Sequence, residues 1–173
     1  MKINTKIRYG LRAMIEIASS ENISGILQKD IAKNQNISTG YLDHIITALK
    51  ANGLIANVNG KRSGYKLLKR PEDITMKDIY TSFEPITILD CLNNETFCDM
   101  TCDCQARDYW ADLKQQIEQM MGSKTLDQVL KKQLQYHVKT FFLKYENQSI
   151  ILPSRFLPDK KFLKYHNNER FQP

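Results

Sequence analysis

The sequence has no run of about 18 apolar residues, which is the length that an α-helix needs to span a lipid bilayer. Its first twenty residues carry five charged side chains, which excludes the apolar centre of a secretory signal. We therefore expect a cytoplasmic protein. That compartment keeps thiols reduced and disfavours structural disulfides.

Residues suited to catalysis are also scarce. The only histidines are His44, His137 and His166, and the sequence shows neither a phosphate-binding loop nor a paired nucleophile and base. We therefore expect that the protein is not an enzyme. No internal repeat is recognisable either, which excludes a repeat architecture.

Positive charge is concentrated in the N-terminal part of the chain. The whole sequence has a net charge of +6 and a pI near 9.1. Residues 1–70 hold twelve Lys or Arg against four Asp or Glu, so the remainder is slightly acidic. This distribution suits a polyanionic partner such as DNA, although a solvated basic surface would give the same counts.

The spacing of apolar residues predicts a winged helix-turn-helix over residues 1–70, in a chain that is mainly α-helical with a small two-stranded β wing. The expected elements are helices at 5–19, at about 27–34 and between a Ser38 cap and Gly53, then strands at 54–58 and 65–68 around a hairpin tip. This segment is the predicted DNA-binding domain.

The third predicted helix is the candidate recognition helix, because its apolar stripe leaves an outer face of hydrogen-bonding side chains. The residues expected to contact DNA are Ser38, Thr39, Tyr41, Asp43, His44 and Lys50 on this helix, and Lys61 and Arg62 at the hairpin tip. Asp43 could accept a hydrogen bond from cytosine, or repel phosphate and so sharpen selectivity. The alternatives are that Tyr41 packs beneath the wing and that His44 is merely exposed.

Residues 71–104 are predicted to form a linker helix, capped by Thr75, and a cysteine loop. A dimerisation helix at about 105–121 and a following helix make up residues 105–146, and a tail of unassigned role occupies 147–173. The long helix carries an apolar stripe that needs a partner helix, which predicts a homodimer. Packing onto its own wing domain is the alternative.

Every cysteine of the chain lies in the predicted loop: Cys91, Cys98, Cys102 and Cys104. Four thiols within fourteen residues favour a metal site, since thiolates bind zinc and iron–sulfur clusters. The intervening gaps of six, three and one residue do not form the paired knuckles of a structural zinc site. The loop has few packing residues, so a bound cluster would order it. Redox-active or incidental thiols are the alternative.

Several independent segments share the pattern of one known family. They are residues 1–14, 37–43 and 49–54, the wing residues Gly60, Gly64 and Tyr65, the Cys91-x6-Cys98-x5-Cys104 spacing, and Trp110. Over roughly residues 1–135 the chain thus resembles the Rrf-two (Rrf2) family of bacterial transcriptional regulators, of the IscR, NsrR and CymR type. The resemblance implies a winged-helix homodimer with crossed long helices that binds a palindromic site in double-stranded DNA.

The resemblance also implies roles for particular residues. In cluster-binding members three cysteines hold a [2Fe–2S] or [4Fe–4S] cluster, and they correspond here to Cys91, Cys98 and Cys104. The acidic position of the recognition helix and the contacting positions of the wing correspond to Asp43, Asn59, Lys61 and Arg62.

The chain departs from the family at the fourth cluster ligand. A histidine that some members place three residues after the last cysteine is Arg107 here, and a guanidinium does not bind a metal as a cation. An acidic ligand that some nitric-oxide sensors supply from the first helix corresponds to Arg8. Cys102 is the candidate replacement, with Asp99, Asp103 or a small external molecule as other possibilities.

Together these patterns predict a DNA-binding transcriptional regulator that senses iron–sulfur status, redox state or nitric oxide through a cluster on the cysteine loop. Two alternatives remain open: a metal-free thiol switch, and control by a regulatory protein partner through the loop or the tail.

Overall fold

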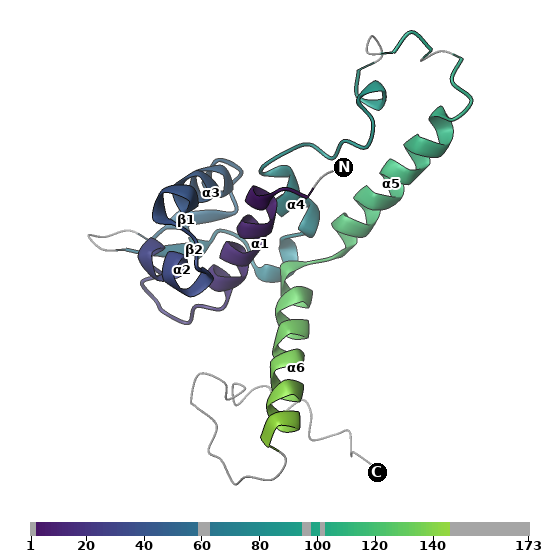
Figure 1. Ribbon diagram of the computed structural model, residues 1–173. Coiled ribbons are helices and arrows are strands. Elements are labelled where there is room, and N and C mark those ends of the chain that lie inside the picture. The colour runs from purple at the N-terminus through teal and green to yellow at the C-terminus, as the bar shows by residue number, and fades with distance from the viewer. Residues whose placement is uncertain (1–2, 59–62, 95–97, 101–102, 146–173) are drawn as a thin grey trace. The chain divides into compact units, whose positions relative to one another are not determined.

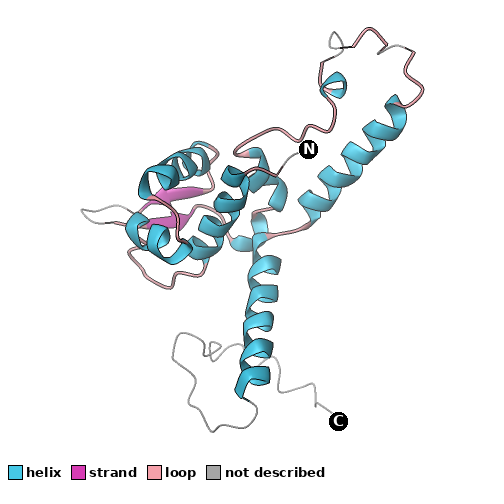
Figure 2. Ribbon diagram, viewed as in Figure 1, coloured by secondary structure: helices cyan, strands magenta, loops and turns pink. Residues whose placement is uncertain are grey.

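The computed structural model describes residues 3–58, 63–94, 98–100 and 103–145, in a chain that divides into two units, Met1–Lys131 and Lys132–Pro173. The helices are α1 (Thr5–Ala18), α2 (Gln28–Gln35), α3 (Thr39–Ala51), α4 (Met76–Thr81), α5 (Arg107–Ser123) and α6 (Leu126–Tyr145) (Figure 1). The strands are β1 (Ile55–Asn57) and β2 (Tyr65–Leu67), and two short 3-10 helices are η1 (Pro71–Asp73) and η2 (Asp90–Leu92) (Figure 2). The predicted mainly helical fold with a two-stranded wing is confirmed. The proposed boundaries at residues 70, 104 and 146 stay predictions.

Local capping sets the ends of the three helices that form the helix-turn-helix. The Asn4 side chain accepts a hydrogen bond from the Ile7 N–H at 3.0 Å and caps α1. Asn36 ends α2 in the left-handed region, at φ 52°, which asparagine tolerates better than most residues. Ser38 caps α3 by accepting the Tyr41 N–H at 3.3 Å, as the sequence predicted.

The main core lies where α1, α2, α3 and β1 meet. Its fully buried side chains are Met14, Ile31, Leu42, Ile45, Leu49, Leu54, Ile55, Ile74, Ile79 and Leu126. Burial of each stabilises the fold by about 1.5–3 kcal/mol before the cost of ordering the chain. Segments distant in sequence join here, because the Leu126 N–H donates to the Ile74 carbonyl at 2.8 Å and so ties the start of α6 to the start of α4.

The wing is an antiparallel hairpin, and a further segment of the chain pairs with its strand β2, which the sequence did not predict. Ile55 pairs with Leu67 in the β1–β2 register. On the other edge of β2, Ile26 and Tyr65 exchange two backbone hydrogen bonds of 3.1 and 2.8 Å. Gly64 approaches the Ile26 backbone so closely that a Cβ atom would collide with it. The hairpin is therefore held against the segment just before α2.

α5 packs onto the apolar core of its own chain through its C-terminal half. Ile117 and Met121 contact a second apolar cluster made of Ile7, Tyr80 and Ile86, which come from α1, α4 and the segment after α4. No residue of α5 is fully buried. The C-terminal half of the helix thus packs onto its own chain, mainly onto α4, and it meets the predicted wing domain only at Ile7 of α1. Of the helices in the described ranges, none is long and apolar enough to cross a membrane.

Candidate DNA-binding surface and cysteine loop

The outer face of α3 presents the side chains that the sequence predicted for DNA recognition. Thr39, Asp43, His44 and Lys50 are all exposed. Ser38 is exposed as well, although its hydroxyl is already engaged as the helix cap. Because the opposite face of α3 is buried in the core, the helix can offer this polar face to a groove without unfolding anything.

Tyr41 packs against α1. It is half-buried, and its ring meets that of Tyr9 edge-on with centroids 5.8 Å apart. The guanidinium of Arg12 lies 5.2 Å from the centre of the Tyr9 ring and that of Arg8 lies 6.0 Å from it. α1 therefore places two cations on the Tyr9 ring, which in turn contacts Tyr41 of the recognition helix, and a count of net charge could not locate them.

A series of side-chain contacts links the recognition helix to the wing. The Gln28 amide nitrogen donates to Asp43 Oδ1 at 2.5 Å, and the Tyr65 hydroxyl donates to Gln28 Oε1 at 3.2 Å. Lys50 Nζ lies 6.0 Å from the centre of the Tyr65 ring. No role could be assigned to Gln28 from the sequence, because nothing in the pattern of α2 shows which residue of α3 it faces.

Three of the predicted DNA-contacting residues, Asn59, Lys61 and Arg62, lie outside the described part of the chain. Their roles stay predictions. The hairpin that carries them is closed by a hydrogen bond of 3.0 Å from the Val58 N–H to the Gly64 carbonyl.

The two ends of the cysteine loop meet at Arg107, the first residue of α5. Its Nη1 donates to the carbonyl of Cys91 at 3.2 Å, and its backbone N–H donates to the carbonyl of Cys104 at 3.1 Å. Lys114, two turns further along α5, donates to the Asn93 side chain at 2.6 Å. Arg107, which stands where some family members have a histidine ligand, thus joins both cysteines to the start of α5.

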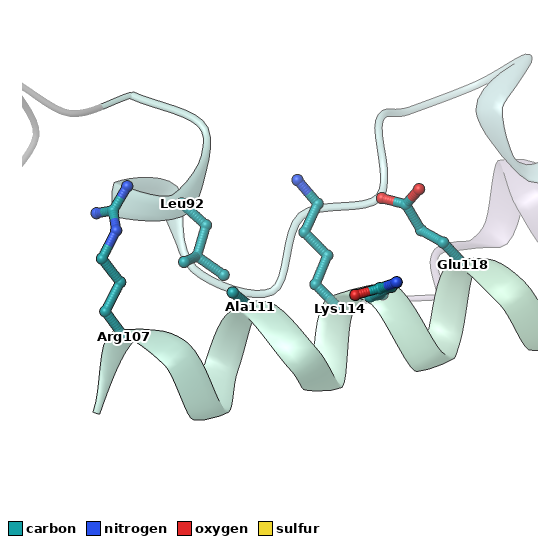
Figure 3. Close-up of a pocket in the computed structure, with 6 residues that line it drawn as sticks. Leu92, Arg107, Ala111, Lys114 and Glu118 are labelled. Carbon is teal, nitrogen blue, oxygen red and sulfur yellow. The ribbon is translucent and has the colours of Figure 1, made fainter. Parts of the chain in front are cut away.

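A groove of about 280 Å³ runs between η2 and α5. Figure 3 shows Leu92 directed toward Ala111, whereas Lys114 and Glu118 extend from α5 on the side of the loop. Lys77 of α4 donates to Glu118 at 2.8 Å, and this hydrogen bond holds the pKa of the Glu118 carboxyl below its ordinary value. Polar contacts therefore join the loop to α5, and the Lys77–Glu118 contact adds to the apolar packing between α4 and α5.

The thiols have the donor chemistry of a cluster site but are not gathered into one. Cys91 and Cys98 are half-buried, and Cys104 is exposed. Among the residues that the structure describes, no three His, Cys, Asp or Glu side chains are placed to hold a metal ion together. Cys102 lies outside those residues. Convergence of the predicted ligands would thus require the loop to change its conformation.

α5 leaves large apolar side chains in solvent near both of its ends. Tyr109 is 63% exposed, and Met120 near the other end of the helix is 59% exposed. The rings of Tyr109 and Trp110 meet edge-on with centroids 5.0 Å apart. An amphipathic helix with such residues uncovered has area available for a second chain.

Comparison with known proteins agrees with this arrangement. The Rrf2 family model, described as an iron-dependent transcriptional regulator, matches residues 3–132. The regulator CymR of Bacillus subtilis is 33% identical over 128 residues, which cover 73% of this chain and 88% of CymR. The IscR regulator of Pectobacterium atrosepticum is 29% identical over 131 residues, which cover 75% of this chain and 79% of IscR.

Solved structures give the same assignment. The structure of B. subtilis CymR, described as the global cysteine regulator, superposes with a TM-score of 0.64 at 30% identity, over 76% of this chain and 98% of CymR. These relatives are transcriptional regulators, in keeping with the expectation that the chain is not an enzyme. With a winged helix-turn-helix, an exposed recognition helix and a family match over most of its length, the chain belongs to the Rrf2 family of DNA-binding transcriptional regulators.

Proposed function

We propose that the chain acts as a homodimer, inserting α3 of each subunit into the major groove of a palindromic site while the two wings contact the flanking DNA. The exposed polar face of α3 supports this reading, as do the cations that α1 places on the Tyr9 ring, which contacts Tyr41 of α3. The uncovered apolar residues of α5, Tyr109 and Met120, supply the surface for the second subunit. Two identical reading heads require a DNA site with matching twofold symmetry.

We further propose that the cysteine loop is the sensory element and holds an iron–sulfur cluster. The observation that carries this proposal is the attachment of Cys91 and Cys104 to one residue, Arg107, at the start of the helix proposed to form the dimer interface. Cys91, Cys98 and Cys104 supply three thiolates, and the fourth ligand is Cys102, Asp99, Asp103 or an external molecule. Such a cluster would supply a centre that responds to iron supply, oxidants or nitric oxide.

The contacts of the loop explain how a change in its conformation could alter DNA binding. Arg107 and Lys114 anchor the first part of the loop to α5, and Glu118 joins α5 to α4 through Lys77. α4 in turn shares the core of the winged domain through Ile79. A change in the loop is therefore expected to alter the spacing of the two recognition helices, and a coupling of about 1–3 kcal/mol changes affinity 5- to 150-fold.

An anaerobic preparation of the full-length protein tests this proposal. We expect a coloured protein that contains iron and acid-labile sulfide, and we expect Cys91→Ser, Cys98→Ser and Cys104→Ser each to remove both. Cys102→Ser separates the candidates for the fourth ligand, because its loss of iron would assign Cys102 and its retention would assign another donor. A colourless, iron-free protein that binds DNA normally would overturn the cluster.

A metal-free thiol switch is the second candidate. It is favoured by the absence of a preformed metal site among the described side chains and by the structure of Staphylococcus aureus CymR in an oxidized form, 31% identical to this chain with a TM-score of 0.58. Two thiols of the loop would lose two electrons and two protons to an oxidant such as a peroxide and form a disulfide. In that case oxidant alone changes the DNA affinity of the iron-free protein, and a dithiol restores it.

A further inference from the structure

Gln28 lies between the recognition helix and the wing and contacts both. The helix-turn-helix fold does not by itself require these contacts. It is the first residue of α2, and it is half-buried although α2 is mostly polar. Its amide nitrogen donates to Asp43 Oδ1 at 2.5 Å and lies 3.5 Å from the Thr39 carbonyl. Its amide oxygen accepts from the Tyr65 hydroxyl at 3.2 Å. Both polar ends of the side chain are therefore engaged within the protein.

We propose that Gln28 is a positioning residue for base recognition, which fixes the Asp43 carboxylate in the orientation that reads a base pair. This proposal rests on the proposed DNA-binding role of Asp43 and names the residue that controls it. Asp43 is exposed on α3, where a free side chain would move among several rotamers. Held through Oδ1 by Gln28, it keeps Oδ2 as an acceptor in a defined direction.

The chemistry of the groove explains why orientation matters for a carboxylate. In the major groove a carboxylate finds one good donor, the exocyclic amino group of cytosine or adenine, among neighbouring acceptor atoms and phosphates that repel it. A fixed carboxylate can therefore favour one base pair strongly, whereas a mobile one averages over favourable and unfavourable directions. Gln28 supplies this restraint without contacting DNA itself, since its own amide faces Asp43 and Tyr65.

Tyr65 extends the restraint into the wing. Its hydroxyl orients the Gln28 amide so that the nitrogen, and not the oxygen, faces Asp43. Tyr65 is itself fixed on β2 by its backbone pairing with Ile26. The direction of the Asp43 carboxylate is thus set by the docking of the wing onto α2, as well as by α3.

The test is selection of bound duplexes from a randomised pool by the full-length protein and its variants, followed by competition binding on the selected site and its single-base changes. Gln28→Leu removes both polar ends at similar volume, Tyr65→Phe removes only the hydroxyl, and Asp43→Asn removes the charge. The matched control is Gln35→Leu, a glutamine of the same helix that bonds Arg12 and Glu16 instead. Thermal unfolding of each variant reports whether the fold is intact.

We expect Asp43→Asn to change the preference at one base pair of each half-site, because an amide reads base edges differently from a carboxylate. Gln28→Leu should reduce the preference at that same base pair by about five- to tenfold, and Tyr65→Phe by less, as expected from loss of one hydrogen bond to a charged group. Gln35→Leu should leave it unchanged. Gln28→Leu should have a much smaller effect in the Asp43→Asn background than in the wild type, because the asparagine amide accepts only a weaker, neutral hydrogen bond from Gln28. The affinity for unrelated DNA and its salt dependence should not change with Gln28→Leu.

Two results would overturn the inference and one would overturn its premise. Gln28→Leu with the wild-type base preference, or effects of Gln28→Leu and Asp43→Asn that add fully, would show that Gln28 does not act through Asp43. If the Asp43→Asn variant still binds DNA with every base preference intact, the proposed role of Asp43 itself is wrong. These outcomes are distinguishable because they fall on different variants.

Discussion

At the scale of single residues, a tight steric constraint lies at the base of the wing. Gly64 touches the backbone of Ile26, where no Cβ atom fits, so Gly64→Ala must push the hairpin away from that segment. We expect a loss of about 2 kcal/mol in the free energy of unfolding, measured by urea denaturation. Gly40→Ala is the matched control, because Gly40 lies in α3 with open space around it and alanine is the better helix former. Equal midpoints for Gly64→Ala and the wild type would contradict the close packing.

The Lys77–Glu118 pair gives the junction of α4 and α5 a dependence on pH. Its hydrogen bond lowers the pKa of Glu118 in the folded chain, below an ordinary value near 4.5. The unfolded chain therefore takes up the proton first as the pH falls, so the contribution of the pair is present at neutral pH and is lost below about pH 4.5. Both side chains are partly exposed, which limits this contribution to about 0.5 kcal/mol.

Glu118→Gln tests this dependence. The variant should be slightly less stable than the wild type in urea denaturation at neutral pH, and the difference should vanish in acid and shrink at high salt, because salt screens exposed charges. A difference that persists unchanged in acid would assign the effect to packing rather than to the ion pair.

At the scale of elements, α5 combines an anchored inner side with an uncovered outer side. Tyr109 and Met120 are both more than half exposed, whereas Ile117 and Met121 pack onto the chain itself. We expect Tyr109→Glu and Met120→Glu each to weaken dimerisation about tenfold or more, because each places a charge in the proposed apolar interface. Sedimentation velocity over a range of concentrations measures this change.

Asp112→Ala is the control for these variants, since Asp112 is an exposed polar residue of the same helix. Glutamate substitutions that leave the sedimentation profile of the wild type in place would mean that the outer side of α5 has another partner. Unfolding curves of the two variants should stay close to the wild type, because neither residue is buried in the chain.

At the scale of the whole molecule, the basic N-terminal region should dominate the affinity for DNA. Residues 1–70 are strongly basic and the remainder is slightly acidic, so binding should weaken steeply as salt rises. We expect Lys61→Ala and Arg62→Ala each to reduce the slope of log affinity against log salt by about two per dimer, since each subunit loses one phosphate contact. Fluorescence anisotropy at several salt concentrations measures the slope.

Lys124→Ala lowers the net charge by the same amount at the end of α5 and is the matched control. We expect its slope to equal that of the wild type. A change of slope as large as that of Lys61→Ala would show that overall charge, and not the wing, governs the salt dependence.

Much of the architecture follows from local patterns in the sequence. Ser38 and Thr75 were predicted as caps, and both accept the expected backbone hydrogen bonds. The order of the helices and strands was confirmed, and their ends agree with the expected ones to within a few residues. Local patterns suffice for this because helical periodicity and caps are properties of neighbouring residues. The membership of the Rrf2 family was likewise readable from segments spread along the chain, and the comparisons confirmed it.

A sequence pattern does not show which residues contact each other between distant segments of the fold. Only the tertiary structure placed Gln28 on Asp43, Tyr41 on Tyr9, and Arg107 on the carbonyl of Cys91. It also decided that the described thiols are not gathered in this conformation, although their spacing suits a cluster. The physical reason is that caps and periodicity are set by residues within one or two turns, whereas these contacts join segments that only packing brings together. The sequence by itself determined the elements and the class of regulator, and the tertiary structure determined which side chains those elements set against one another.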